Sequence, residues 1–314
     1  MPVRITRRTL LAAAAASALR AGFPGRSAIG ANTAIDGYGI FDAIALLHKI
    51  GFPAIEIHTM GVPEATPGCF PGFQFDRIPE AMKRRIRAAL APFEEVTAHL
   101  PYSGLHYFSK ESAEASIRTV DTALDGAAYF GAKVAVLHPM APEGYSADEG
   151  ARVMLRQIRQ WGDRARERRV RLALETGYAQ SVHEFLRLVW EVDHPWVGGA
   201  LDVGHQSHYK ELVARVKPEE RSTPAGIRAY NDIDIAIVEG LQDKLFHLHV
   251  HDIDPKTWKE HQPLRFGFID YPRLIAKLRE VGYTGLLILE IGAPAAEMPR
   301  DLADAKRRLE GWLG

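Results

Sequence analysis

Leu245-Phe246-His247-Leu248-His249-Val250-His251-Asp252 alternates apolar residues with histidines and ends in a carboxylate. This two-residue period predicts a β-strand whose three histidines share one face while its leucine and valine share the other. Histidine is only intermediate in burial, and aspartate is almost never buried without a partner, so such a face is unusual for a plain core. The stretch therefore predicts a strand that carries a metal site.

The rest of the chain alternates short apolar strands with helical periodicity, which is typical of βα units around a parallel sheet. Helices over 38–50, 112–130 and 271–281 each end at a glycine that is followed by a strand. One more helix is expected to begin at the capping residue Ser181, and Asp270 is the expected N-cap of the helix over 271–281. In all, the pattern predicts eight strands: 27–32, 54–56, 95–99, 134–138, 171–175, 197–202, 245–250 and 286–290.

Eight βα units of this size predict a (β/α)8 TIM barrel, formed by a single domain over residues 27–314. A doubly wound sheet would need a glycine-rich phosphate-binding turn after the first strand, and the sequence has none there. A long polar segment from His208 to Tyr230 follows the sixth strand. We expect it to be a mobile cover over the barrel mouth.

Charge and cysteine content exclude several classes of function. Lys and Arg together number 39, as do Asp and Glu, so the formal net charge is +0. Without a basic excess, nucleic acid is not expected as a partner. Cys69 is the single cysteine, which excludes an intramolecular disulfide and any site with several thiolates. A metal in this protein must therefore bind histidines and carboxylates.

Residues 1–26 resemble a twin-arginine signal. Arg7-Arg8 precedes an alanine-rich apolar run that reaches Leu19. The run is shorter than the ~20 residues of a transmembrane helix, so stable membrane insertion is not expected. An amphipathic N-terminal helix is the alternative, but the alanines leave no polar stripe. The segment predicts export to the periplasm or the medium.

Polar residues collect where the predicted strands end. Singly, such a histidine or carboxylate is explained by core packing or by capping of the next helix. Together they would meet at the mouth of a barrel, where clustered carboxylates repel one another unless a cation is bound. These residues are Glu56, His99, His138, Glu175, Asp202, His205, His249, Asp252 and Glu290.

The segments around these residues resemble the xylose isomerase-like superfamily of barrels. Within it they are most similar to the sugar phosphate isomerase/epimerase group, which includes ketose 3-epimerases, inosose dehydratases and, more distantly, endonuclease IV. The resemblance spans Ile50 to the C-terminus. It rests on Thr97-Ala98-His99-Leu100-Pro101-Tyr102, Leu137-His138-Pro139, Leu172-Ala173-Leu174-Glu175, Leu201-Asp202-Val203-Gly204-His205, His249-Val250-His251-Asp252, Gly267-Phe268-Ile269-Asp270-Tyr271 and Gly282-Tyr283-Thr284-Gly285 with Glu290.

The resemblance implies a divalent metal held by Glu175, Asp202, His249 and Glu290. Three carboxylates and one imidazole suit Mn²⁺ best, while Mg²⁺, Co²⁺ or Zn²⁺ also fit. Such a metal chelates a sugar carbonyl and the neighbouring hydroxyl, which acidifies the carbon–hydrogen bond between them. Glu175 and Glu290 are then expected to be the catalytic acid/base pair.

The endonuclease IV subgroup binds three zinc ions, and its extra ligands correspond to His99, His138, His205 and His261. Lys259 stands where that subgroup has an aspartate, and a charged lysine cannot bind a metal. A complete third zinc site is therefore not expected, and the four histidines are expected to bind an additional metal or the substrate. Substrate contacts are expected for Glu56, Trp258, Lys259 and Arg265. His251 and Asp252 are expected to orient His249, and His247 is expected to be a core residue.

The sequence thus predicts a metal-dependent isomerase or epimerase that acts on a sugar or a glycoside. Two alternatives stay open. One is a lyase with the same chemistry, either an inosose dehydratase or a 3-keto-glycoside eliminase. The other is a non-catalytic periplasmic sugar-binding protein, in which the pair Glu175 and Glu290 would be superfluous.

Overall fold

Eight parallel strands close into one barrel in chain order in the computed structural model, which describes residues 25–314. The predicted TIM barrel is confirmed. The strands are β1 (Ile29–Asn32), β2 (Ala54–His58), β3 (Glu95–His99), β4 (Val134–Leu137), β5 (Arg171–Glu175), β6 (Val197–Asp202), β7 (Leu245–Val250) and β8 (Leu287–Leu289).

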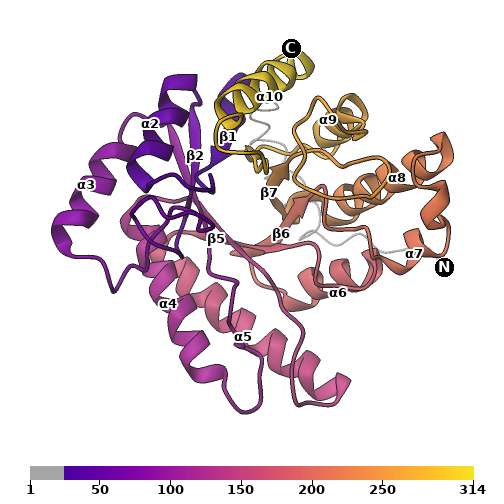
Figure 1. The fold of residues 1–314 in the computed structure, drawn as a ribbon. Coiled ribbons are helices and arrows are strands. Elements are labelled where there is room, and N and C mark those ends of the chain that lie inside the picture. Colours follow the sequence, from indigo (N-terminus) through magenta and orange to yellow (C-terminus); the bar gives the residue numbers. More distant parts are fainter. Residues whose placement is uncertain (1–24) are drawn as a thin grey trace, which may run out of the picture.

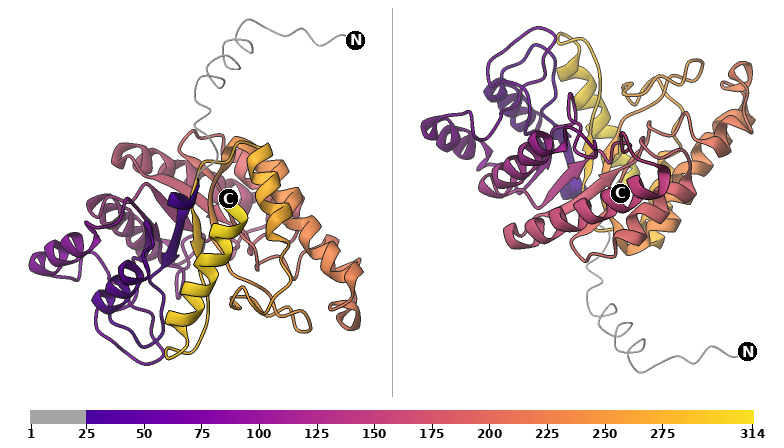
Figure 2. Two further views of the ribbon diagram at one scale, coloured as in Figure 1. Left: turned by 90° about the horizontal axis from the view of Figure 1, so that it is seen from above. Right: turned by 90° about the horizontal axis from the view of Figure 1, so that it is seen from below.

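Helices surround the strands (Figure 1), and α10 lies along β1 (Figure 2). The α-helices are α2 (Ile40–Ile50), α3 (Glu80–Leu90), α4 (Ala113–Tyr129), α5 (Ala147–Arg168), α6 (Val182–Val192), α7 (Lys210–Val213), α8 (Pro224–Leu241), α9 (Tyr271–Glu280) and α10 (Met298–Leu313). Short 3-10 helices are η1 (Arg26–Ala28), η2 (Pro218–Glu220) and η3 (Gln242–Lys244).

The turn chemistry predicted for the helix ends is present. Gly51, Gly131 and Gly282 follow α2, α4 and α9 with φ values of 85°, 82° and 73°, a left-handed conformation that glycine adopts without strain. Ser181 accepts a hydrogen bond from the N–H of Glu184, and Asp270 accepts one from the N–H of Arg273. These caps fix where α6 and α9 leave the barrel mouth.

Apolar side chains fill the barrel below the polar strand ends. Ala173 lies two residues before Glu175 and Ala200 two residues before Asp202, so each pair shares the inner face. They pack with Val134, Val136 and Phe246 in a small cluster that is separate from the main core between strands and helices. The packed interior leaves only the mouth for chemistry.

The segment from His208 to Tyr230 is not the long loop that was predicted. It contains α7, η2 and the start of α8, and Tyr209, Leu212 and Tyr230 are fully buried. The Tyr230 hydroxyl donates a hydrogen bond to the carbonyl of Gly204, 2.8 Å away. The expected long loop is therefore wrong, because apolar and aromatic anchors inside the polar run hold parts of it against the barrel, and its mobility stays a prediction.

The predicted signal segment, residues 1–26, lies almost entirely outside the described residues. Within residues 25–314, no helix combines the length and the apolar character needed to cross a membrane.

Candidate metal centre at the barrel mouth

Four ligand-type side chains converge at the carboxyl ends of four neighbouring strands. Glu175, Asp202, His249 and Glu290 come from β5, β6, β7 and the residue after β8, and each offers a ligand atom within 4.8 Å of the others. Nδ1 of His249 lies 2.7 Å from Glu175 Oε1, 3.0 Å from Glu290 Oε2 and 3.9 Å from Asp202 Oδ2. The structure thus brings together all four predicted metal ligands.

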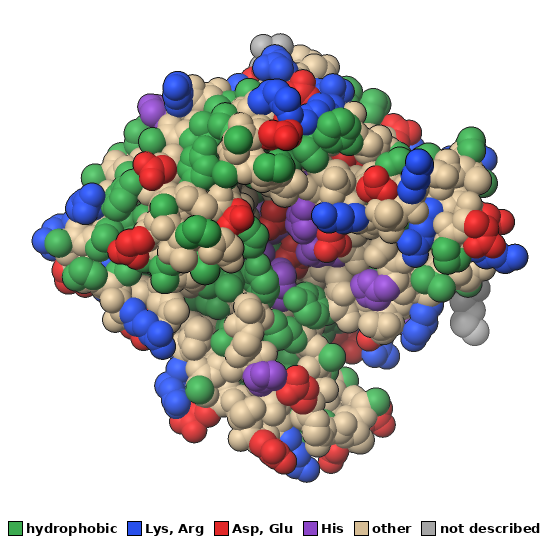
Figure 3. Space-filling model, viewed as in Figure 1, with side chains coloured by type: hydrophobic (Ala, Val, Ile, Leu, Met, Phe, Trp, Pro, Cys, Tyr) green, Lys and Arg blue, Asp and Glu red, His purple; other side chains and the backbone are tan. Residues whose placement is uncertain are grey.

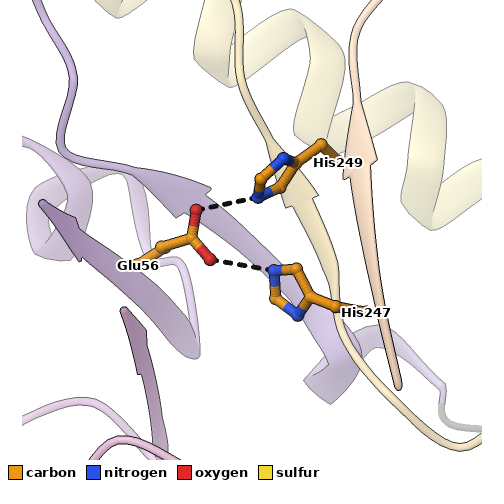
Figure 4. A group of neighbouring side chains, drawn as sticks. All are labelled: Glu56, His247 and His249. Carbon is orange, nitrogen blue, oxygen red and sulfur yellow. Dashed lines mark hydrogen bonds and ion pairs between the residues drawn. The ribbon is translucent and has the colours of Figure 1, made fainter. Parts of the chain in front are cut away.

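The other ring nitrogen of His249 faces Glu56. Glu56 lies between His249 and His247, with Nε2 of each histidine 2.9 Å from one of its carboxylate oxygens (Figure 4). Asn32 Nδ2 and Thr97 Oγ1 donate to the same two oxygens at 3.1 and 3.0 Å. Glu56 is fully buried, accepts hydrogen bonds from Asn32, Thr97 and His249 and pairs with His247, so it acts as the support that orients His249.

The electrostatics of the cluster call for a cation. Burial lowers the pKa of His249, but the carboxylates of Glu56, Glu290 and Glu175 outweigh burial and raise it well above the usual value. Burial likewise raises the pKa of Glu290, yet His249 brings it down to about 2. A charged imidazole therefore compensates the carboxylates when no metal does.

The donor set fits a divalent metal. Oδ2 of Asp202 is buried and accepts no hydrogen bond, which is costly for a carboxylate oxygen unless a cation lies beside it. Three carboxylates and one imidazole favour Mn²⁺ and related hard or borderline ions. Glu175, Asp202, His249 and Glu290 could hold such an ion with Nδ1 of His249 unprotonated.

Two further clusters adjoin this centre. His99, His138 and Glu175 can share one ion, with Nε2 of His99 3.5 Å from Glu175 Oε2 and Nε2 of His138 closer still. Asp202, His205 and His261 form the other. Burial lowers the pKa of His205, but Asp202 and Glu175 raise it to about 9. All four additional histidines that the sequence singled out thus lie at the mouth.

The four additional histidines line a pocket of about 440 Å³ together with Glu175 and Glu290. Figure 3 shows it as a hollow in which histidine and acidic side chains are visible. The residues that line it are His99, Tyr102, His138, Glu175, Gly177, Tyr178, His205, Ser207, His208, Glu260, His261 and Glu290.

Four predicted substrate contacts lie elsewhere. Glu56 is buried beneath the pocket. Trp258 is 4% exposed and packs against Tyr230 and Arg221. Lys259 is exposed outside the pocket lining, and Arg265 pairs with the buried Asp301. Glu56 lies on β2, and the loop after β7 carries the other three, so none of the four side chains lines the pocket in this structure.

The predicted roles of His251 and Asp252 also change. Nε2 of His251 donates to Asp202 Oδ1 at 2.9 Å, and its Nδ1 accepts from the backbone N–H of His261 at 2.9 Å. Asp252 accepts from the N–H groups of Ile253, Phe268 and Ile269. His251 therefore supports Asp202 and His261 rather than His249, while Asp252 anchors the loop.

Sequence reasoning missed two tyrosines of the pocket. The Tyr178 hydroxyl lies 2.6 Å from Nδ1 of His138, and Tyr102 stacks on the same ring with a centroid distance of 4.6 Å. Both sit a few residues after a strand that ends in a ligand-type residue, at 99 and 175. That position was the available signal, because loops at the carboxyl ends of barrel strands build the site.

Comparison with known proteins gives a family and a set of similar structures. A family model described as a xylose isomerase-like TIM barrel matches residues 44–311. No curated protein matches the sequence.

Solved structures share the fold at low sequence identity. A D-tagatose 3-epimerase-like protein is 20% identical with a TM-score of 0.67, covering 91% of this chain and 96% of that one. The apo form of 3-keto-D-glucoside 4-epimerase from E. coli is 18% identical with a TM-score of 0.63, over 89% and 99%. A xylose isomerase-like TIM barrel protein from Mycobacterium smegmatis in complex with magnesium is 15% identical with a TM-score of 0.64, over 93% and 100%.

Proposed function

Because this chain belongs to the xylose isomerase-like TIM barrel family, we propose that it is a metal-dependent sugar isomerase or epimerase. One observation carries the proposal: Glu175 and Glu290 converge within 3.0 Å of the same nitrogen of His249. A divalent metal in this centre would chelate a carbonyl and the neighbouring hydroxyl and so acidify the carbon–hydrogen bond between them. The epimerases among the similar structures support sugars as the substrate class.

The two glutamates then exchange protons with the substrate carbon. Glu175 stands at the end of β5 and Glu290 after β8, so β6 and β7 separate their strands around the barrel. The side chain of Glu290 is 18% exposed and that of Glu175 is fully buried, although both line the pocket. Against the effect of burial, neighbouring histidines hold both pKa values low, so each carboxylate is ionised at neutral pH and can act as a base.

Mn²⁺ is the metal we propose, because oxygen donors dominate the centre. Mg²⁺, Co²⁺ and Zn²⁺ are the alternatives, and one similar structure contains magnesium. For His99, His138, His205 and His261 we propose contacts with substrate hydroxyls or with an additional ion, because they surround the same pocket.

Solvent deuterium tests this function. The purified protein, loaded with Mn²⁺, is incubated in deuterated water with D-fructose, D-tagatose and methyl 3-keto-D-glucoside, and the sugars are followed by NMR. An epimerase incorporates deuterium at the inverted carbon, and an isomerase incorporates it next to the carbonyl that moves. Chelation should abolish the exchange, and added Mn²⁺ should restore it.

The same experiment separates the alternatives. In the same mixture a lyase would release methanol from the keto-glucoside, or water from an inosose added as a fourth substrate, without inverting a carbon. A non-catalytic binding protein would bind sugars with no exchange at any carbon. Either result would replace the isomerase or epimerase assignment.

A further inference from the structure

An apolar groove runs between α5 and α6 on the same side of the barrel as the pocket. Its volume is about 290 Å³. The loops after β4 and β5 form its inner end, and its walls are the first half of α5 and the length of α6 from Glu184 to Glu191. Apolar side chains dominate the lining, among them Pro139, Ala151, Met154, Leu155 and Leu188.

The groove begins where the pocket ends. Tyr178 lines both, and its hydroxyl contacts Nδ1 of His138, a pocket residue. Pro139 follows His138 directly, and Tyr178 comes three residues after Glu175. A molecule held beside Glu175 could therefore extend past Tyr178 into the groove.

The chemistry of the groove selects a neutral, apolar group. Its charged side chains stand on α6 and already have partners: Arg187 lies 3.9 Å from Glu191, and Glu184 accepts a hydrogen bond from the N–H of Gln180. Met154 and Leu188 are only half-buried, so apolar area stays open to solvent. A sugar ring would lose hydrogen bonds to water there, whereas an apolar group would gain from burial.

We propose that this groove binds the apolar aglycone of a glycoside whose sugar ring occupies the pocket lined by Glu175 and Glu290. The placement of the sugar end rests on the proposed function. The substrate class is then a glycoside with an aryl or alkyl substituent rather than a free monosaccharide. Tyr178 stands at the junction, beside the bond that joins sugar and aglycone.

Binding tests the groove without relying on turnover. Isothermal titration of the Mn²⁺-loaded protein compares phenyl and methyl pyranosides of glucose, galactose and mannose. Phenyl glycosides of at least one sugar should bind about tenfold or more tightly than their methyl counterparts. If no phenyl glycoside binds more tightly than its methyl counterpart, the inference is overturned, whether or not D-fructose is turned over.

Two variants locate the effect. Ala151→Trp fills the groove and should remove the preference for phenyl. Ala115→Trp adds the same bulk at an alanine that lines a separate groove beside α4, and it should keep the preference. Leu188→Ala provides a second reading if Ala151→Trp fails to fold, because it removes contact area and should weaken phenyl binding while methyl binding stays the same.

The remaining outcomes are also decisive. The parent protein could prefer phenyl glycosides, lose that preference in Ala151→Trp and yet turn over no sugar. This result would support the groove as an aglycone site and contradict the proposed function. If Ala151→Trp instead changes a dimer to a monomer in sedimentation and leaves the phenyl preference intact, the groove is an interface between two copies and the inference fails.

Discussion

Glu56 Oε1 lies 2.9 Å from Nε2 of His249, while Nδ1 of the same ring faces Glu175 and Glu290. A carboxylate at Nε2 keeps the proton on that nitrogen, so the lone pair of Nδ1 is available to a metal. Figure 4 shows that the second oxygen of Glu56 faces His247, which extends from the same strand as His249. The ligand geometry of the centre therefore depends on a residue that cannot touch the substrate.

Glu56→Gln should weaken metal binding. Each carboxylate oxygen accepts at least one hydrogen bond and lies 2.9 Å from a histidine nitrogen, and an amide has only one acceptor oxygen, so its NH₂ group would replace one of these acceptors. Loss of a metal ligand's hydrogen-bonded partner typically costs 10–100-fold in affinity. Titration with Mn²⁺ should show a change of about this size, and ¹⁵N NMR should show a mixed tautomer for His249.

Thr97→Val is the matched control for Glu56→Gln. It removes one donor to Glu56 and leaves the contact with His249 in place, so the effect on Mn²⁺ affinity should be much smaller. Equal metal affinity in the parent and Glu56→Gln would show that Glu56 does not determine the tautomer.

The strand positions of the site could be predicted from the sequence because a barrel repeats one unit. The bounds of β3, β5, β6 and β7 agree with the predicted ranges, since each has a clear apolar period and a flanking turn signal. Once those strands are parallel neighbours, their final residues must meet at one mouth. This is why Glu175, Asp202 and His249 could be placed together.

Loop residues could not be placed in this way. Trp258 and His261 both have a φ of 58°, a left-handed conformation that local sequence does not predict for these residue types. The first lies buried away from the pocket, and the second lines it. The different positions of the two side chains depend on tertiary contacts, such as the hydrogen bond from the N–H of His261 to His251.

Because of Asp234, the free energy of unfolding should fall as pH rises. Both of its carboxylate oxygens are buried in α8 without a hydrogen-bond partner, and burial, together with the charge of Asp202, raises its pKa well above that of an exposed carboxyl. The folded protein therefore holds this proton after the unfolded chain has lost it near pH ~3.9. Folding then costs up to about 1.4 kcal/mol more for each pH unit, until the folded pKa is reached.

Asp234→Asn removes that titration. Urea unfolding at a series of pH values should show the variant gaining stability relative to the parent as pH rises. Asp232→Asn, an exposed carboxylate on the same helix that pairs with Arg273, should show no such gain. Parallel profiles for the parent and Asp234→Asn would contradict the raised pKa.

Arg265→Ala should reduce stability and leave sugar binding unchanged. Arg265 pairs with Asp301, which is only 1% exposed, and lies outside the pocket lining. Removal of one partner of a buried charge typically costs about 1–3 kcal/mol. Arg300→Ala removes a second, more exposed partner of Asp301 and should cost less. A raised KM in Arg265→Ala at normal stability would restore Arg265 as a substrate contact.

We propose export through the twin-arginine route, because Arg7-Arg8 precedes an alanine-rich apolar run. Fractionation of cells that express the native gene should recover a shortened protein outside the cytoplasm. Replacement of both arginines by lysine keeps the charge and should leave the protein inside. Full-length, cytoplasmic protein without the replacement would contradict this assignment.

Glu290→Gln should separate metal binding from catalysis. The amide keeps the shape and one oxygen ligand, so Glu175, Asp202 and His249 should still retain a substantial part of the metal, about one ion per chain in the parent. The base is lost, however, because an amide cannot accept the substrate proton, and turnover should fall by ~10² or more. Metal analysis and the rate of deuterium incorporation measure the two effects on the same sample.

Asp202→Asn and His249→Ala should lose metal, because each removes a ligand. In Asp202→Asn, excess Mn²⁺ should partly restore activity. Glu280→Gln, whose side chain is 68% exposed on α9, is the control that should change neither quantity. Full activity in metal-free protein, or a Glu290→Gln variant as fast as the parent, would show that proton transfer does not pass through this centre. Loss of activity in Glu290→Gln with metal retained would instead assign the base to the residue after β8, since the ligand set would be intact and only the proton acceptor changed.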